Sequence, residues 1–351
     1  MIMTQYQSEK LKVLSFIAII LVLYIHSGFH DIPNEIQGMA FNHYLQESIS
    51  GMLGRCAVPL FYAISGYLFF LNTDKGIAVI GRKMKKRVKT LLIPFVIAAL
   101  FFPAFYLLME LLPFTSTYIN GDGVFSKNLQ LPVSEVFTSL FWHKPGGTTP
   151  WAFHLWFLRD LILIVAISPL LYYVRKAIGR SMLTLVLFLF SFFRLDDVPV
   201  YALFWFMAGD AFLMKLDKAN MYWIPATFCA LTVAEFAFPE LQWKYVQIPI
   251  IALGIISIWN LYDRIVHISF ELEKHKWLYL SCQFTFFIYL FHEPTLNIIR
   301  KLLIFPLGRS SFGFAVNYLI SPWIFAITFI FIGYYFNKCL PRIYAICVGG
   351  R

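Results

Sequence analysis

Two histidines lie near the ends of long apolar stretches of this sequence, where an ionisable side chain is rare. His26 lies near the end of the apolar stretch Leu11 to Phe29, which is otherwise broken only by Lys12 at its start. His292 lies at a similar depth of a later stretch and precedes Glu293 and Pro294. Ionisable groups are costly inside a bilayer and usually mark a functional site. Histidine is also the side chain best suited to move protons near neutral pH. The two histidines therefore indicate acid–base chemistry inside a membrane.

The composition predicts a helical membrane protein. Hydrophobic residues make up 59% of the 351 residues and charged residues only 14%, whereas soluble domains carry about a quarter charged residues. The net charge of +10 gathers between apolar stretches, where the positive-inside rule places Lys and Arg, so it does not indicate nucleic-acid binding. The five cysteines form no CxxC pattern, and we expect neither a disulfide framework nor a metal site.

About ten apolar stretches predict an all-α bundle of about ten transmembrane helices in a single domain over residues 1–351, since about 20 residues cross the hydrocarbon core. Their expected limits are 11–29, 56–71, 91–112, 152–173, 181–193, 199–214, 222–238, 246–262, 278–298 and 318–337. The basic loop 72–90 is expected on the cytoplasmic side, which places both termini there too. Arg300, Lys301 and Arg309 then fall outside, against the rule.

Five motifs follow one another along the chain. They are His26 with Ser27, RCAVPLFYAISGYLFF at 55–70, a basic segment running into LLIP at 91–94, HLWFL at 154–158 and FFIYLFH at 286–292. In type and order they resemble the motifs of integral membrane acyltransferase family 3, and the chain is most similar to its short, envelope-glycan O-acetyltransferase-like forms.

The resemblance implies transfer of an acyl group, in the first place acetyl, from cytoplasmic acyl-CoA to a hydroxyl group of an extracytoplasmic or lipid-linked sugar. It implies a multi-pass protein of a bacterial inner (cytoplasmic) membrane, whose partners are acyl-CoA, the glycan acceptor and membrane lipids. Many members carry arginine eleven residues before the first-span histidine, where this chain has Ser15. Lys12 lies one turn earlier on about the same helix face and is the candidate replacement.

Within this resemblance, the expected catalytic residues are His26, Arg159 and His292. His26 would be the general base, since a positioned imidazole contributes about 10²–10⁴-fold; the alternative is a histidine that only hydrogen-bonds between helices. His292 could orient His26, bind the acceptor or cap its helix. Arg159 could polarise the thioester carbonyl or hold the donor, or form a structural ion pair. Because adjacent helical residues do not face each other, we expect Arg159 and Asp160 to have separate partners.

The phosphate groups of coenzyme A require cations, since Lys and Arg bind phosphate well. The expected donor-binding residues are Lys83, Lys86 and Arg87, although the same basic segment also fixes topology and binds anionic lipid. Acceptor binding is expected at Trp151, His154 and Trp156, because aromatic faces stack on sugar rings. Tryptophan is common at membrane interfaces in any case.

The sequence lacks a Walker loop, a GxGxxG, an HExxH and a GxSxG motif, which favours direct transfer over a covalent acyl-enzyme and leaves the two-step route open. A transporter or flippase of a glycan or lipid-linked sugar is the alternative function. It would also need buried polar groups, but it would show clearer internal repeats and no coenzyme A site. A structural membrane protein whose histidines only pack is the third reading.

Overall fold

The computed structural model describes residues 3–29, 38–116, 125–192, 199–218, 222–238 and 244–350. These residues form helices and turns without a β-strand, which confirms the all-α membrane fold. The first half contains α1 (Gln5–His26), α2 (Met39–Gln46), η1 (Glu47–Leu53), η2 (Gly54–Cys56), α3 (Ala57–Phe70), η3 (Thr73–Lys75), α4 (Ile77–Arg87), η4 (Val88–Leu92), α5 (Ile93–Leu111), α6 (Pro113–Ser116), η6 (Asn128–Gln130), α7 (Val133–Phe141), η7 (Phe153–Leu155) and α8 (Trp156–Ala166). The second half contains α9 (Ser168–Ile178), α10 (Arg180–Phe190), α11 (Val200–Phe212), η8 (Leu213–Lys218), α12 (Trp223–Ala237), α13 (Lys244–Ile265), η10 (Leu272–Lys274), α14 (Lys276–Leu307), α15 (Ser311–Cys339) and α16 (Pro341–Cys347).

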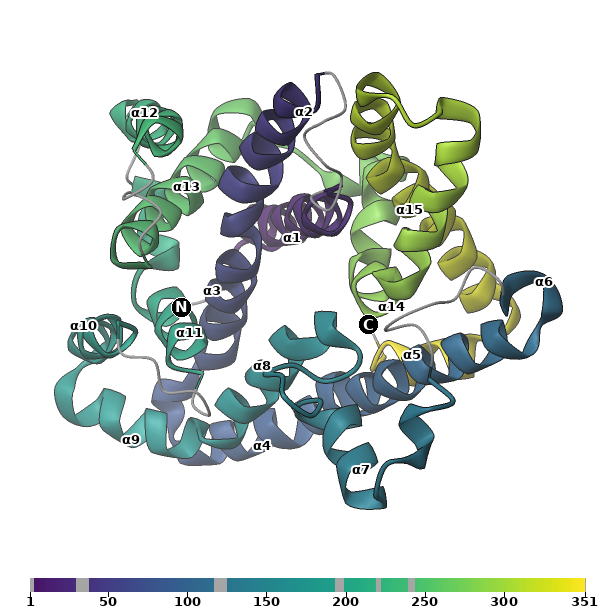
Figure 1. The fold of residues 1–351 in the computed structure, drawn as a ribbon. Helices are drawn as coiled ribbons and strands as arrows, with labels where there is room; N and C mark the ends of the chain where they lie inside the picture. The colour runs from purple at the N-terminus through teal and green to yellow at the C-terminus, as the bar shows by residue number, and fades with distance from the viewer. Residues whose placement is uncertain are drawn as a thin grey trace.

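Helix α1 lies in the interior of the bundle (Figure 1), packed between α3 on one side and α14 on the other. Most of its length is apolar and buried. Because neighbouring helices cover it on several sides, the polar side chains on its covered faces lie against protein. Helix α1 is therefore the element that carries His26 into the interior.

Each of the ten predicted stretches coincides with a helix or a helix pair. Within the described residues, four helices are long and apolar enough to cross a membrane alone, or five if one bent pair counts as a span. The four are Met39–Lys75, Ile77–Leu111, Gln247–Ile265 and Ser311–Cys339. Several others are short and apolar, α10 and α11 among them. The predicted number of ten crossings stays a prediction.

Two segments differ from their expected form. Residues 152–173 are not one continuous helix, because α8 ends at Ala166 and α9 begins at Ser168 with a bend of 63°. Pro169 explains the break, since proline lacks an N–H and disfavours helical geometry in the residue before it. The basic loop 72–90 is largely helical: α4 continues through η4 into α5.

Gly66 of the second motif has a packing role, which it shares with Gly209 of α11. A Cβ atom on Gly66 would lie 1.8 Å from the carbonyl oxygen of Phe206, and one on Gly209 would lie 1.9 Å from that of Ala63. Small residues let membrane helices approach closely. The two glycines therefore allow α3 and α11 to pack backbone against backbone.

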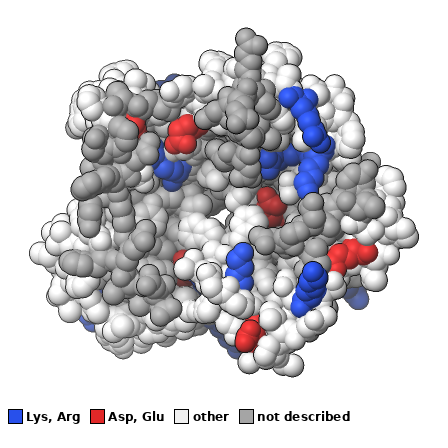
Figure 2. Space-filling model, in the orientation of Figure 1, with Lys and Arg blue, Asp and Glu red and all other residues white. Residues whose placement is uncertain are grey.

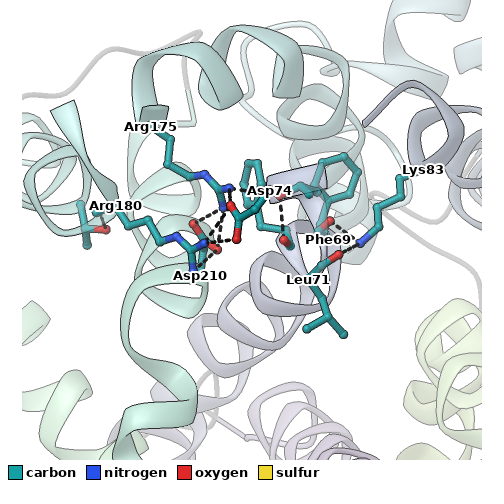
Figure 3. Close-up of polar contacts among 10 residues, drawn as sticks. Phe69, Leu71, Asp74, Lys83, Arg175, Arg180 and Asp210 are labelled. Carbon is teal, nitrogen blue, oxygen red and sulfur yellow. Dashed lines mark hydrogen bonds and ion pairs between the residues drawn. The ribbon is translucent and has the colours of Figure 1, made fainter. Parts of the chain in front are cut away.

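The end of α3 is held by the side chain of Lys83. Its ammonium group donates to the carbonyl oxygens of Leu68 (3.0 Å), Phe69 (2.6 Å) and Leu71 (2.7 Å), and Figure 3 shows it reaching from α4 to this end. The last carbonyl groups of a helix have no partner within the helix. An ammonium group has three N–H donors, so Lys83 satisfies three carbonyl groups and fastens α4 to α3.

An ion-pair network lies beside this contact (Figure 3). Arg175 of α9 donates to both carboxylate oxygens of Asp210 on α11 (3.0 and 2.9 Å) and to Asp74 of η3 (2.8 Å). Arg180 of α10 donates to Asp74 as well. The network joins four elements around the end of α3, next to the helix that carries the basic residues.

Candidate functional site

Three histidines that are distant in sequence lie together in the structure. The ring centroids of His26 and His292 are 5.0 Å apart, and those of His154 and His292 are 4.8 Å apart. His26 is the last residue of α1, His154 belongs to η7, and His292 precedes a non-helical residue of α14, Glu293. We call these three residues the histidine cluster. It joins two of the expected catalytic residues to one expected acceptor residue.

Hydrogen bonds to the backbone orient two of these rings. Nδ1 of His292 lies 2.7 Å from the carbonyl oxygen of Tyr289, and Nε2 of His154 lies 3.2 Å from that of Leu290. Because a carbonyl group only accepts, these ring nitrogens carry the protons. The remaining nitrogens, Nε2 of His292 and Nδ1 of His154, are buried and have no partner in the described part of the chain. An unsatisfied buried polar atom costs about 1–3 kcal/mol, so both are suited to accept hydrogen bonds from a ligand.

His26 is more accessible than the other two. Residue His26 as a whole is partly exposed, whereas His154 and His292 are buried at 3% and 0% exposure. Its ring packs against Phe153, with the centroids 5.5 Å apart. A base must reach the proton that it removes, and His26 is the member of the cluster that a substrate could approach.

The contacts of Arg159 are with a neighbouring loop. Its guanidinium donates to the carbonyl oxygens of Trp142 (2.7 Å) and Thr148 (3.0 Å). It also pairs with Asp160 at 2.9 Å, so the expectation of separate partners is wrong. The long arginine side chain folds back onto the adjacent carboxylate, which the rule for helix faces does not consider. Through these hydrogen bonds, Arg159 links α8 to the loop at 142–148.

The expected acceptor residues occupy different environments. Trp151 is buried and meets Phe125 edge to face, with the ring centroids 5.3 Å apart. Trp156 is the first residue of α8 and is partly exposed. Of the three, His154 is the one whose ring contacts His292. The structure therefore brings one of the three into the histidine cluster.

A cavity of about 830 Å³ lies among α1, α3, α4, α8 and α14, within the size range of ligand pockets. Four cations line it: Lys12, Lys83, Lys86 and Arg87. We call it the basic cavity. All three expected donor residues are on its wall, joined by Lys12, with Ser15 on the same wall. The ammonium of Lys83 is engaged by the end of α3, which leaves Lys12, Lys86 and Arg87 better placed for an anionic ligand.

Tyr289 stands between the basic cavity and the histidine cluster. It lines the cavity, and its ring centroid is 6.0 Å from that of His292. Its hydroxyl donates to the carbonyl oxygen of His154 at 3.0 Å. Phe157, 5.6 Å away between ring centroids, also lines the cavity. The two aromatic rings therefore form a wall at the end of the cavity nearest the histidines.

Sequence reasoning missed two residues at this site. Tyr289 lies inside the FFIYLFH motif, but nothing in the motif says that it faces both a cavity and a histidine. Arg300 donates to the carbonyl oxygen of His26 at 3.0 Å. The sequence feature that could have pointed to Arg300 is its place on the outer side, against the positive-inside rule. That feature marks a cation but does not show which groups it contacts.

The comparison with family models identifies the family of the chain. In the described residues no group of three or more His, Cys, Asp and Glu side chains is arranged to hold a metal ion. Neither the search of curated proteins nor that of solved structures gives a match. A family model described as an acyltransferase domain matches residues 9–337, a range that contains the histidine cluster and nearly all of the basic cavity. The chain therefore belongs to acyltransferase family 3 and is a membrane acyltransferase.

Proposed function

We propose that this protein is an O-acyltransferase that uses acyl-CoA, in the first place acetyl-CoA, and acylates a hydroxyl group of a glycan or lipid-linked sugar. One observation carries the proposal: the basic cavity ends about one helix turn from the histidine cluster. Tyr289 and His292 are three residues apart on α14, or about 4.5 Å along the helix axis. An anion-binding cavity next to a base suits a reaction between two substrates.

The donor is proposed to bind in the basic cavity. Lys86 and Arg87 on α4 and Lys12 on α1 line it, and charge-assisted hydrogen bonds to phosphate are among the strongest available. Beyond these cations the wall is apolar, with Leu158 and Leu161 among the lining residues. The pantetheine arm would lie along this wall, with the thioester toward Tyr289.

His26 is proposed to be the general base. It takes the proton of the acceptor hydroxyl as that oxygen attacks the thioester carbonyl carbon. The new C–O bond forms, the C–S bond breaks, and the coenzyme A thiolate leaves and takes up the proton that His26 removed. The open nitrogens of His154 and His292 would accept hydrogen bonds from further hydroxyl groups and orient the sugar. Trp151 and Trp156 remain candidates for stacking on it.

The role of Arg159 follows from its contacts. Arg159 donates to carbonyl groups of the 142–148 loop and so holds this loop against α8. The η7 turn, which carries His154, directly precedes α8. We propose that Arg159 shapes the acceptor side of the site in this way, as a positioning residue, in place of direct contact with the thioester.

Coenzyme A binding tests the function against a transporter or a structural protein. Micromolar coenzyme A should raise the melting temperature of the detergent-purified protein, because a ligand that binds only the folded state stabilises it. Acetyl transfer from acetyl-CoA to an envelope glycan fraction should then be measurable. A melting temperature that is insensitive to coenzyme A at millimolar concentration would contradict the proposal.

Arg87→Ala should weaken acyl-CoA binding by about 10- to 100-fold, because a hydrogen bond to a charged group contributes about 1.5–3 kcal/mol. The effect should shrink as salt rises. Titration calorimetry at low and high salt measures it. Arg82→Ala is the matched control, since Arg82 is on the same helix, is exposed and does not line the cavity. Equal affinities of the two variants at low salt would show that the basic helix serves topology and lipid binding alone.

The basic cavity is proposed to face the cytoplasm of a bacterial inner membrane, with both termini on that side. In a cysteine-free background, a membrane-impermeant maleimide applied to intact cells should label Lys144→Cys. It should label Lys85→Cys only after the membrane is opened. Both positions are exposed in the structure. The reverse labelling pattern would overturn the orientation and, with it, the side from which the donor enters.

A further inference from the structure

Arg300 connects α14 to the end of α1 at the residue proposed as the base. Its guanidinium donates to the carbonyl oxygens of His26 (3.0 Å) and Gly28. These carbonyl groups lie at and beyond the C-terminus of α1, where no intrahelical donor remains. The C-terminal end of a helix also carries partial negative charge, which favours a cation there. Arg300 therefore caps α1 at His26.

The arginine is itself held in place from two sides. The guanidinium carbon lies 4.5 Å from the centre of the Phe29 ring, a cation–π contact. The amide group of Asn317 on α15 donates to the backbone carbonyl oxygen of Arg300 at 2.9 Å. Arg300 thus fixes three elements, α1, α14 and α15, to one another at the histidine cluster.

The hydrogen bonds from Arg300 to the end of α1 explain why a cation lies at this position, which the positive-inside rule does not. Basic side chains gather over the region where α14 ends and α15 begins (Figure 2), where Lys301 and Arg309 are exposed and Arg300 is partly buried. A forked guanidinium can satisfy two carbonyl groups at once, which the single ammonium centre of lysine does less well. The geometry of Arg300 is therefore that of a fixed support, whereas its neighbour Lys301 is a solvated cation.

We propose that Arg300 is a positioning residue that holds the backbone at His26 and so keeps its imidazole aligned with His292 and with the acceptor. The proposal rests on the function proposed above. His26 is the last helical residue of α1, and Ser27 and Gly28 follow it, so without the cap its backbone is free to fray. Catalytic groups must stay within about 0.5 Å of the productive geometry, and a displacement of about 1 Å can cost about 100-fold in rate.

The test compares Arg300→Ala, Arg300→Gln and Arg300→Lys with Lys301→Ala, all purified in detergent. Arg300→Ala should lower kcat about 10- to 100-fold and leave the KM for acyl-CoA within about twofold, because neither Arg300 nor His26 lines the basic cavity. Arg300→Lys should recover part of kcat, and Lys301→Ala should resemble the wild type. If Arg300→Ala folds poorly, Arg300→Gln supplies the same comparison with one remaining donor.

A double-variant cycle separates positioning from other roles. If Arg300 acts through His26, then Arg300→Ala should cause no further loss of kcat in a His26→Ala background, since residues that act as a unit are not additive. Full additivity would overturn the positioning role, as would unchanged kcat per folded molecule in Arg300→Ala and Arg300→Gln. An active His26→Ala variant would instead overturn the assignment of His26 as the base, and a melting temperature insensitive to coenzyme A would overturn the proposed function, so these failures are distinguishable from that of Arg300.

Discussion

His26→Ala should lower turnover by at least about 100-fold, the effect typical of removing a general base, while coenzyme A affinity changes little. The affinity should persist because His26 does not line the basic cavity, and Lys12, which does, is 14 residues earlier on α1, about 21 Å along the helix axis. Turnover, coenzyme A affinity and melting temperature are measured on the same purified samples. The wild-type pH–rate profile should have an acidic limb, since a protonated base cannot take a proton, and the variant should lack that limb.

The packing alternative predicts the reverse of these results. A histidine that only joins helices would give a destabilised His26→Ala whose turnover per folded molecule is preserved. His267→Ala is the matched control, because His267 is an exposed histidine outside the histidine cluster and should affect neither quantity. His154→Ala and His292→Ala should raise the KM of the acceptor more than that of acyl-CoA, since their open nitrogens are proposed to bind sugar hydroxyl groups. A fully active His26→Ala would make His292 the next candidate base.

The positions of the helices could be predicted because apolar length is a local property of the sequence. The ten stretches all coincide with a helix or a helix pair. The two errors occur where apolar length or charge alone does not determine whether a segment is helical. Pro169 breaks one predicted span into α8 and α9. The cations of segment 72–90 predict a loop, but residues 77–87 form α4, because Lys and Arg are good helix formers.

The site could be predicted only in part. A sequence shows the residue types, but it does not show which residues distant in the chain come into contact. His26 and His292 were marked by their depth in apolar stretches, yet the 5.0 Å between their rings depends on how α1 packs against α14. Lys83, Lys86 and Arg87 were equivalent in the sequence. The structure distinguishes them. The carbonyl groups at the end of α3 accept hydrogen bonds from Lys83, whereas Lys86 and Arg87 line the basic cavity without this contact.

The second large effect is expected from Asp210→Ala, which should destabilise the folded protein by about 3–5 kcal/mol. The side chains of Asp210 and Arg175 are only 4% and 5% exposed, and they are 2.9 Å apart. Removal of the carboxylate leaves a buried guanidinium whose remaining acidic partner, Asp74, is 70% exposed. The buried guanidinium then keeps only a solvent-exposed carboxylate partner, and a buried charge that has lost its buried partner is costly. Unfolding in mixed micelles, followed by circular dichroism, gives the free energy of unfolding.

Two further variants show whether the loss comes from the stranded charge. Asp210→Leu combined with Arg175→Met should recover most of the stability, since replacing both members of a buried pair by apolar residues is often nearly neutral. Glu271→Ala, which breaks an exposed pair with Lys274, should have little effect. The network also fixes η3, from which α4 and its cations start, so Asp210→Ala should weaken coenzyme A binding in the folded fraction. If the double variant is as unstable as Asp210→Ala, the network acts by specific geometry and not by charge compensation.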